Sequence, residues 1–391
     1  MSLVVALAVL LSLPLLVIDL VFGLEVLLGL RTGPKPPIAD VPADIALLVP
    51  AHNEEGAVRA SVAAMRAAAP GTRILVVAHN CSDRTADEAL AGGAEVYRLD
   101  EPTKRGKGYA LAGGRDALST TPPVIVIVVD ADCVPDPGSI ATLAATAART
   151  GRVTQASYLF RPRPDASPVV QISNFAMLVK NLVRQRGGRR LGAPALMTGS
   201  GMAFPWELFA RLDLATGNIV EDLAIGVELV AAGSPPVFEE HATIWSSPSS
   251  EGGTATQRAR WEGGFLATAR KIGLPLALRG LTTLRWPMLW MGLHLLTLPL
   301  TLLLLANAAA LLLWFLLWLL GGPGLPFAMA LLVALAIVGL VLAAWAVAGR
   351  AMLSAATLVR LPLYLLWKIG LYARILRKTE QPAWVRTERV D

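Results

Sequence analysis

The stretch that most constrains the fold is residues 124–133, VIVIVVDADC. An unbroken apolar and β-branched run of this length predicts a strand that is buried on both faces, as in a parallel sheet. The strand ends in Asp130, Ala131 and Asp132. Side chains two residues apart on an extended backbone share a face, so both aspartates can reach one ion at the carboxyl edge of the sheet. Paired carboxylates favour Mg²⁺ or Mn²⁺. The alternative is that these aspartates only cap the following turn.

Strand and helix patterns alternate through residues 43–157. Strands are expected at residues 45–49, 73–77, 95–99, 124–130 and 153–157, with helices at 54–69 and 82–91. This alternation predicts an α/β fold with a mainly parallel sheet flanked by helices. Residues 158–284 form a less regular second half, which begins in a loop rich in proline and arginine. Helices are expected there at 170–186, 223–232 and 254–271, and an extended stretch at 197–204.

Both ends of the chain are strongly apolar. The 391 residues have a mean hydropathy of +0.55, and the excess is concentrated in residues 2–24, 286–320 and 325–349. No basic residue precedes the first segment and no clear cleavage site follows it, so residues 1–30 are predicted to be an uncleaved transmembrane anchor. The uncharged GGPG turn at 321–324 joins the other two segments. Residues 286–349 are therefore predicted to be a transmembrane helical hairpin.

Basic residues near the ends of the apolar segments predict the orientation. They are Arg31, Lys35, Arg270, Lys271, Arg279, Arg285 and Arg350. The positive-inside rule places these flanks in the cytosol, so we expect a multi-pass protein of the plasma (inner) membrane with the middle of its chain cytosolic. The net charge of +6 is then mainly due to these membrane-flanking residues. Nucleic-acid binding is not expected, because the middle of the chain shows no basic patch interleaved with aromatics. The two cysteines, Cys81 and Cys133, provide no disulfide framework and are expected to be packing residues.

Residues 351–378 mix basic side chains with leucine, tyrosine and tryptophan. This pattern favours a basic amphipathic helix on the cytosolic membrane face, followed by a cytosolic tail at 379–391. The alternative is a fourth membrane crossing, which would place the tail outside.

Three polar motifs lie in the first half. VPAHNEE, residues 49–55, follows the first strand, and Asn53 and Glu54 can bind a ribose or base or cap a helix. AHNCSDRTA, residues 78–86, follows the second strand, and Asp83 has the same two interpretations. RGKGYAL, residues 105–111, places Lys107 and free amides at a helix start, which suits a phosphate, although a solvated turn explains it equally.

Three further motifs lie in the second half. TGSGMAF, residues 198–204, places Gly199, Ser200 and Gly201 where a chain or sugar can approach closely, or where packing requires a bend. NIVEDLAIG, residues 218–226, carries Glu221 and Asp222; Asp222 is a candidate general base or else a charge at a helix start. In QRARW, helical spacing places Gln257, Arg260 and Trp261 on one face, where arginine suits a diphosphate and tryptophan suits a sugar. A surface helix anchored by its tryptophan is the alternative.

The order VPAHNEE, NCSD, RGKG, DAD, GSGMAF, ED and QRARW resembles the membrane-bound family 2 glycosyltransferases, which include the cellulose, chitin, hyaluronan and poly-N-acetylglucosamine synthases. The resemblance covers residues 45–271 and the flanking apolar segments. It implies a GT-A-type fold, a nucleotide-diphosphate sugar donor, most simply a UDP-sugar, a divalent metal ion and inversion at the anomeric carbon.

The resemblance also implies roles for individual residues. Asp222 would be the catalytic base, Asp83 would contact the base of the nucleotide, and Asp130 and Asp132 would bind the donor and its Mg²⁺ or Mn²⁺. The nucleotide-sugar site would comprise Pro50, His52, Asn53, Glu54, Asn80, Asp83, Lys107, Asp130, Ala131 and Asp132. The acceptor and diphosphate site would comprise Gly199, Ser200, Gly201, Glu221, Gln257, Arg260 and Trp261. His79 departs from the pattern, since many relatives carry an acidic residue there.

The expected function is extension of a glycan at the cytosolic membrane face, in extracellular or capsular polysaccharide synthesis. Three expected spans are fewer than those of the large synthases, so an export partner protein is expected for a polymer product. Two alternatives are open: the same chemistry on a lipid acceptor such as a polyprenyl phosphate, and a membrane scaffold that binds a sugar nucleotide without turnover. Asp222 argues against the scaffold, because a binder has no use for a base.

Overall fold

The computed structural model describes residues 3–35, 40–216, 221–247 and 251–377. The chain divides into two compact units. Among the described residues one, the sheet unit, comprises Thr32–Arg161 and Pro194–Gly264. The other, the apolar-helix unit, comprises Met1–Arg31, Pro162–Ala193 and Phe265–Gln381. Residues 162–193, which we expected in the second half of the sheet domain, thus cluster with the apolar helices.

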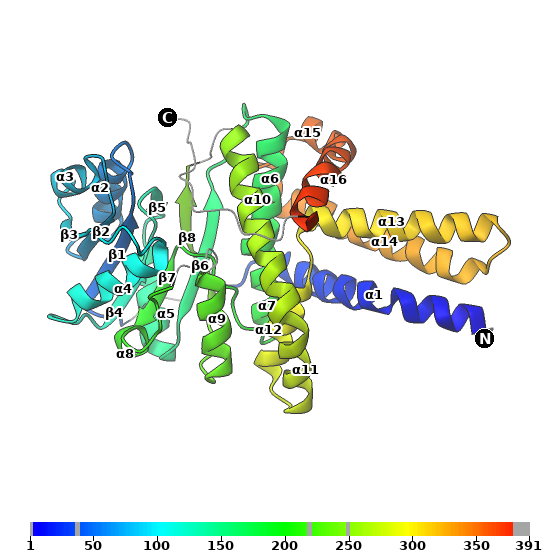
Figure 1. Cartoon of the computed structure of the whole chain (residues 1–391), viewed down its shortest axis with the longest axis horizontal. Coiled ribbons are helices and arrows are strands. Elements are labelled where there is room, and N and C mark those ends of the chain that lie inside the picture. Colours follow the sequence, from blue (N-terminus) through cyan, green and yellow to red (C-terminus); the bar gives the residue numbers. More distant parts are fainter. Residues whose placement is uncertain (1–2, 36–39, 217–220, 248–250, 378–391) are drawn as a thin grey trace. The chain divides into compact units, whose positions relative to one another are not determined.

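The sheet unit is built on one eight-stranded sheet in the order β3-β2-β1-β4-β7-β6-β8-β5 (Figure 1). The strands are β1 Ile45–Ala51, β2 Arg73–His79, β3 Glu95–Leu99, β4 Ile125–Val128, β5 Cys133–Pro135, β6 Thr154–Phe160, β7 Met202–Pro205 and β8 Val237–Ser246. The first four in spatial order are parallel, as expected. β7 runs antiparallel to both β4 and β6, and β5 runs antiparallel to β8. The predicted α/β fold with a sheet flanked by helices is confirmed. The sheet contains both parallel and antiparallel strand pairs.

Alternation along the strands divides the core between the two faces of the sheet. In β1, Leu47 and Val49 belong to one buried cluster and Ala46 and Leu48 to another. The first cluster is completed by α2 Val58–Ala68, α3 Thr85–Ala91 and α5 Ser139–Thr150. The second is completed by α4 Lys107–Leu118, α8 Trp206–Phe209 and α9 Glu221–Ala231. Helices on both faces explain why the central strands are continuously apolar.

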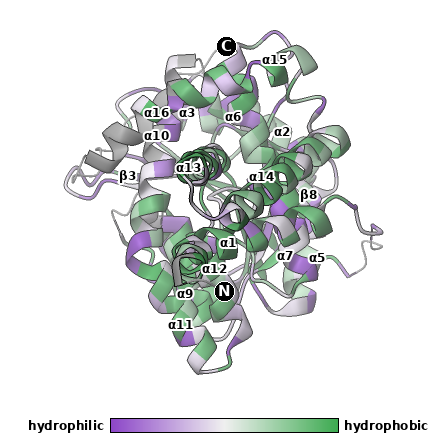
Figure 2. Ribbon diagram, turned by 90° about the vertical axis from the view of Figure 1, so that its right-hand side faces the viewer, coloured by the Kyte–Doolittle hydropathy of each residue, from purple (hydrophilic) through white to green (hydrophobic). Residues whose placement is uncertain are grey.

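Three long apolar helices dominate the other unit. α1 Leu3–Gly29, α13 Leu300–Leu319 and α14 Gly324–Ala344 lie side by side in Figure 1 and are predominantly green, the colour of hydrophobic residues, in Figure 2. Residues 8–29, 300–319 and 324–349 are long and apolar enough to cross a membrane. Three membrane-length helices therefore agree with the three spans expected from the sequence, but the second begins at Leu300 and not at Trp286. The segment 286–320 is not one continuous helix. It is two helices, α12 Trp286–Leu296 and α13, because Pro299 disfavours helical geometry in the residue before it.

A buried polar cluster ties α1 to two other segments of the same unit. The Glu25 carboxylate lies 2.6 Å from Arg184 Nε and 3.0 Å from His294 Nδ1, and it accepts a hydrogen bond from the Trp290 indole. A methyl group on Gly187 would overlap the carbonyl oxygen of Glu25, so glycine is required for this approach. Arg184 and Gly187 come from the continuous helical run of α6 Pro168–Leu178, the π-helical turn Val179–Arg184 and α7 Gln185–Arg190.

The remaining helices include α10 Glu251–Thr268 and α11 Leu274–Thr282, separated by the π-helical turn Ala269–Gly273. After α14 come the π-helical turn Trp345–Gly349, α15 Ala355–Val359 and α16 Leu361–Arg377. The expected interfacial helix at 351–378 thus corresponds to α15 and α16, while the tail from residue 378 lies outside the described residues.

Candidate active site

The centre of the site is the side chain of Lys107, at the first residue of α4. Its ammonium group is ion-paired with the Asp130 carboxylate and donates a 2.6 Å hydrogen bond to the carbonyl oxygen of Gly199. The Lys107 side chain is 17% exposed and that of Asp130 is 26% exposed, so the pair is sheltered but reachable from solvent. This contact joins the RGKG, DAD and TGSG motifs.

The loop before β7 reaches this centre because β7 is inserted next to β4. The Ser200 hydroxyl accepts a 3.1 Å hydrogen bond from the backbone N–H of Asp130. Gly199 has φ of +86°, which favours glycine, and a Cβ there would lie 3.4 Å from both Asp222 Oδ2 and Lys107 Nζ. A Cβ on Gly201 would lie 2.6 Å from the Ile244 side chain. Gly201 is therefore needed for close packing, while Gly199 is favoured by its positive φ.

Helix α9 begins with Glu221 and Asp222, the two acidic residues of the NIVEDLAIG motif. Residues 218–220 of this motif lie outside the described residues. Asp222, like Lys107, lies beside Gly199, and its Oδ1 accepts a hydrogen bond from the backbone N–H of Leu223. Glu221 is buried and lines a cleft. The cleft's other lining residues are Asp213, Leu214, Thr216, Ala224, Ile225 and Glu228. Burial, and then repulsion from Asp222, raises the pKa of Glu221 to about 8.

Lys107 is held in its charged form by these acids. Burial by itself lowers its pKa, but attraction to Asp130, Glu221 and Asp222 outweighs burial and raises the pKa above the ordinary value. The ammonium group consequently compensates the carboxylates that the DAD and ED motifs bring together.

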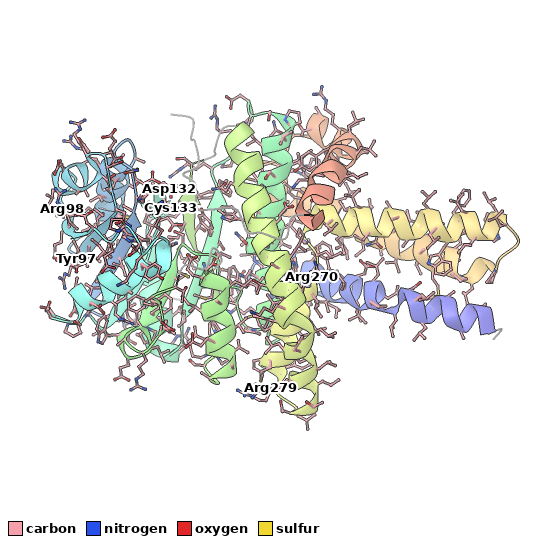
Figure 3. All side chains as sticks on the ribbon, viewed as in Figure 1. Tyr97, Arg98, Asp132, Cys133, Arg270 and Arg279 are labelled. Carbon is pink, nitrogen blue, oxygen red and sulfur yellow. The ribbon has the colours of Figure 1, made fainter. Side chains whose placement is uncertain are left out.

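Asp130, Asp132 and Cys133 form a group whose ligand atoms all lie within 4.8 Å of one another; Figure 3 labels the last two. Burial, followed by the negative charge of Asp130, raises the pKa of the Cys133 thiol to about 12, so it remains protonated. Its Sγ donates a 3.3 Å hydrogen bond to Asp132 Oδ1. Asp130 and Asp132 offer two carboxylates, hard oxygens that fit Mg²⁺ or Mn²⁺, whereas a cysteine sulfur is a soft ligand that suits these ions poorly.

Comparison with known proteins identifies the chain's family. Its sequence matches the family described as "Glycosyltransferase like family 2" over residues 42–264, more than half of the chain. The chain belongs to glycosyltransferase family 2. The match covers every motif described above from VPAHNEE to QRARW, and the prediction of a glycosyltransferase is confirmed. No curated protein sequence matches this glycosyltransferase, and its place among the polysaccharide synthases stays a prediction.

Two solved structures were found to be similar to the glycosyltransferase. The mannosyltransferase PcManGT from Pyrobaculum calidifontis, in complex with GDP-Man and Mn²⁺, matches 96% of this chain and 99% of its own, with 17% identity and a TM-score of 0.55. Glucosyl-3-phosphoglycerate synthase from Mycobacterium tuberculosis, in complex with Mn²⁺, UDP and glucosyl-3-phosphoglycerate, matches 56% of this chain and 77% of its own, with 20% identity and a TM-score of 0.39. The likeness to PcManGT confirms the GT-A-type fold.

The residues that we predicted to bind the nucleotide lie mainly at the carboxyl ends of β1 and β2. The tripeptide Ala-His-Asn occurs at both ends, and Asn53 and Asn80 have φ of +54° and +49°. Asn53 Oδ1 accepts from the Ser82 N–H and Asn80 Oδ1 from the Glu101 N–H. The two asparagine side chains hold the loops at this sheet edge by accepting hydrogen bonds from backbone N–H groups, as turn-forming residues do.

The other residues of this edge make similar loop contacts. His52 Nδ1 lies 2.8 Å from the carbonyl oxygen of His79, and the Glu54 N–H donates to the Thr85 hydroxyl. Asp83 accepts hydrogen bonds from the N–H groups of Glu55 and Thr85. Pro50 lies within β1, paired in register with Val77. These contacts bring Pro50, His52, Asn53, Glu54, Asn80 and Asp83 to one edge, beside β4 and Ala131, and their roles toward a nucleotide stay predictions.

The QRARW motif of the glycosyltransferase is more buried than expected. Gln257 is buried, and Trp261 packs on the ring of Phe160 in β6, with centroids 6.3 Å apart. The side chain of Arg260 lies outside the described residues. Sequence reasoning missed Arg258, which is buried, with its guanidinium 5.1 Å from the Phe160 ring centre and 5.3 Å from that of Trp261. Its spacing of three residues from Trp261 was the available signal.

Proposed function

We propose that this glycosyltransferase moves a sugar from a nucleotide-diphosphate donor to an acceptor hydroxyl, with inversion and with a divalent metal ion bound by Asp130 and Asp132. One observation carries the proposal. Lys107 links Asp130, in the donor motif, to Gly199, beside which Asp222 lies. Four motifs that are distant in sequence thus meet where a donor diphosphate and an acceptor would react. PcManGT, of similar fold, binds GDP-Man and Mn²⁺, a donor and an ion of these classes.

In the proposed reaction Asp222 accepts the proton of the acceptor hydroxyl as its oxygen attacks the anomeric carbon. The bond from that carbon to the diphosphate oxygen breaks on the opposite face, and the electron pair leaves with the nucleoside diphosphate. Lys107 is ion-paired with Asp130, which is proposed to bind the donor. The Lys107 ammonium group would therefore lie near the departing diphosphate and neutralise part of its negative charge. A bound Mg²⁺ or Mn²⁺ would supply further charge stabilisation there.

The raised pKa of Glu221 supports the choice of Asp222 as the base. Glu221, with a pKa of about 8, is mostly protonated at neutral pH and cannot accept the proton. Asp222 lies beside Gly199, whose carbonyl oxygen accepts a hydrogen bond from Lys107, at the centre of the proposed site. We therefore assign proton transfer to Asp222, and to Glu221 a place in the wall of the neighbouring cleft.

The donor and acceptor are proposed at the level of chemical class. A UDP-sugar is the first donor to test, and a growing glycan in extracellular or capsular polysaccharide synthesis is the first acceptor. A polyprenyl phosphate is the second acceptor, favoured by the three apolar helices that would keep the enzyme in the membrane with lipid substrates. Under either alternative we propose a plasma-membrane location with the sheet unit in the cytosol, since the basic residues flank the apolar segments on that side.

The test uses purified membranes that contain the full chain. They are incubated with a panel of nucleotide sugars, with Mn²⁺ or after chelation, and the release of nucleoside diphosphate is measured. We expect one donor to be consumed only with metal, and Asp222→Asn to reduce the rate by about 10²- to 10⁴-fold. Asp116→Asn, at a side chain that is 68% exposed, is the control. An Asp222→Asn rate equal to wild type would overturn the assignment.

Sizing of the products distinguishes the acceptors. A ladder of glycan lengths supports glycan extension, whereas one lipid-linked sugar supports the lipid acceptor. A polymer that stays on the donor side of sealed vesicles would support the expected export partner. Donor binding without any nucleoside diphosphate release would favour the scaffold.

A further inference from the structure

Cys133, the residue that follows the DAD motif, makes a side-chain contact with that motif (Figure 3). It is fully buried in the core of the sheet unit, and its Sγ donates a 3.3 Å hydrogen bond to Asp132 Oδ1. Asp132 is also buried, with only 8% of the residue exposed. A hydrogen bond in such surroundings is stronger than one in water, so it restrains the carboxylate. The sequence predicted packing alone for this cysteine.

The backbone fixes Cys133 from two sides. Its N–H donates a 3.0 Å hydrogen bond to the carbonyl oxygen of Asp130, which closes the turn that carries Asp132. Cys133 is also the first residue of β5 and is paired in register with Ser246 of β8. The sulfur therefore belongs to the sheet, whereas the carboxylate that it contacts belongs to the turn. A donor on a rigid element can hold a functional side chain in one orientation.

Other buried polar side chains surround the sulfur. The hydroxyl groups of Ser200 and Ser246 interact with Cys133. The Tyr158 hydroxyl interacts with both Ser246 and Cys133. All three hydroxyl residues are buried, and they come from the loop before β7, from β8 and from β6. Since buried polar groups cost free energy unless they are paired, this cluster beneath the DAD turn calls for a reason other than packing.

The hydrogen-bonding capacity of a thiol suits this position. The hydrogen of Cys133 is directed to Asp132, while a thiol sulfur is also a weak acceptor for the hydroxyl groups behind it. Hydrogen bonds in a chain polarise one another, so a hydroxyl that donates to the sulfur strengthens the donation from the thiol to the carboxylate. The cluster thus restrains Asp132 from the interior of the sheet unit.

We infer that Cys133 is a positioning residue for Asp132, whose thiol holds the carboxylate in the orientation in which it binds a divalent metal ion. This role rests on the proposed function, because it takes Asp130 and Asp132 as the ligands. Groups that hydrogen-bond to metal ligands orient them and raise the affinity for the ion. The sulfur itself is not assigned as a ligand, because Mg²⁺ and Mn²⁺ prefer oxygen.

The test compares two variants of the full chain in lipid nanodiscs. Cys133→Ser keeps a side-chain donor and Cys133→Ala removes it, while both lose the volume of the sulfur. Binding of Mn²⁺ is measured from the loss of the electron paramagnetic resonance signal of the free ion. We expect the dissociation constant of Cys133→Ala to be about tenfold above that of wild type, and that of Cys133→Ser to stay within about threefold of it. Asp132→Ala should lose this binding.

Thr146→Val is the matched control. The Thr146 hydroxyl donates a 3.1 Å hydrogen bond to Glu239 Oε2, and both residues are buried in the sheet unit. This is another buried donor on a buried carboxylate, but Glu239 lies toward the opposite end of β8 from Ser246. We expect Thr146→Val to lower the unfolding midpoint and to leave the dissociation constant for Mn²⁺ unchanged.

Infrared spectroscopy detects the hydrogen bond without any metal ion. The chain has two cysteines, so Cys81→Ser leaves a single S–H stretching band, that of Cys133. A thiol that donates to a carboxylate absorbs at lower frequency than a thiol without an acceptor. We expect Asp132→Ala, made in the Cys81→Ser background, to move the band to higher frequency. An unmoved band would overturn the inference.

The binding experiment distinguishes the positioning role from the proposed reaction. Equal affinity for Mn²⁺ in Cys133→Ala and wild type would overturn the positioning role and leave glycosyl transfer intact. An equal loss in Cys133→Ala and Cys133→Ser would also overturn it, because the sulfur and not the donor would then set the affinity. Wild-type affinity in Asp132→Ala would overturn both assignments. Binding that needs the donor, in a chain that releases no nucleoside diphosphate, would support the positioning role and contradict the reaction.

Discussion

Lys107 is ion-paired with Asp130, although the two residues are 23 positions apart and belong to different motifs. The pair brings the start of α4 to the end of the central strand, and the same ammonium group binds the carbonyl oxygen of Gly199. One side chain therefore holds three segments together at the place where the proposed reaction occurs.

Replacement of this lysine tests its electrostatic role. We expect Lys107→Met, which keeps most of the stem but removes the charge, to lower the rate of nucleoside diphosphate release by about 100-fold, the usual cost of losing one such stabilising group. Lys104→Met is the matched control, because Lys104 is exposed and pairs only with surface Glu101 among the ion pairs of the described residues. A Lys107→Met rate within about twofold of the control would contradict the role.

Gly199 provides a second test, of geometry rather than charge. In Gly199→Ala the new methyl group would lie 3.4 Å from Asp222 and Lys107, and an alanine would be strained at the φ of +86°. We expect activity to fall by at least about tenfold, because relief of the strained positive φ would move the Gly199 carbonyl oxygen that binds Lys107. Gly71→Ala is the control, because Gly71 has φ of +80° and open space around it. Both variants should lose about 1–2 kcal/mol of stability, but only Gly199→Ala should lose activity.

The raised pKa of Glu221 predicts a pH-dependent stability. Since the folded state favours the protonated acid, this group's contribution is fully present below its unfolded-state pKa of 4.5 and is lost as pH rises through about 8. Glu221→Gln cannot lose a proton and should keep the contribution. The thermal midpoint of Glu221→Gln minus that of wild type should therefore increase as the pH is raised from 4.5 to 8. Tryptophan fluorescence in detergent measures it, with Glu228→Gln, an exposed residue of the same helix, as control. A constant difference across this range would be inconsistent with a buried protonated Glu221.

Arg258 is predicted to support the QRARW helix. In Arg258→Met the two ring contacts with Phe160 and Trp261 are lost, which should cost about 2 kcal/mol because they are buried. Arg98→Met removes an exposed ion pair with Asp87 and should cost less than about 1 kcal/mol. The unfolding midpoints of the two variants are compared by the same fluorescence assay. Equal midpoints would show that the ring contacts add nothing.

The sequence predicted the elements whose physical signal is local. The runs that became β1, β2 and β4 are apolar because helices cover both faces of the sheet, and their strand pattern is unambiguous. β8 was missed because Glu239, Glu240 and His241 interrupt its apolar positions. Pro299 was the available sign that residues 286–320 contain two helices.

The candidate site was predicted as a set of motifs but not as an arrangement. The contact between Lys107 and Gly199 depends on β7 entering the sheet antiparallel to β4, a long-range choice that no local pattern encodes. The raised pKa of Glu221 depends on burial, which the adjacent letters ED do not reveal. The contact of Trp261 with Phe160 in β6 is a long-range packing contact that the spacing of QRARW does not reveal, and the role of Trp261 toward a sugar stays a prediction.

The buried contact of Glu25 with Arg184 has a consequence for shortening the protein. Removal of residues 1–30 would strand the guanidinium group of Arg184 in an apolar interior without its carboxylate partner, a loss that typically costs about 3–5 kcal/mol. A soluble catalytic fragment should therefore omit residues 162–193 together with the first helix, and join residue 161 to residue 194 through a designed linker.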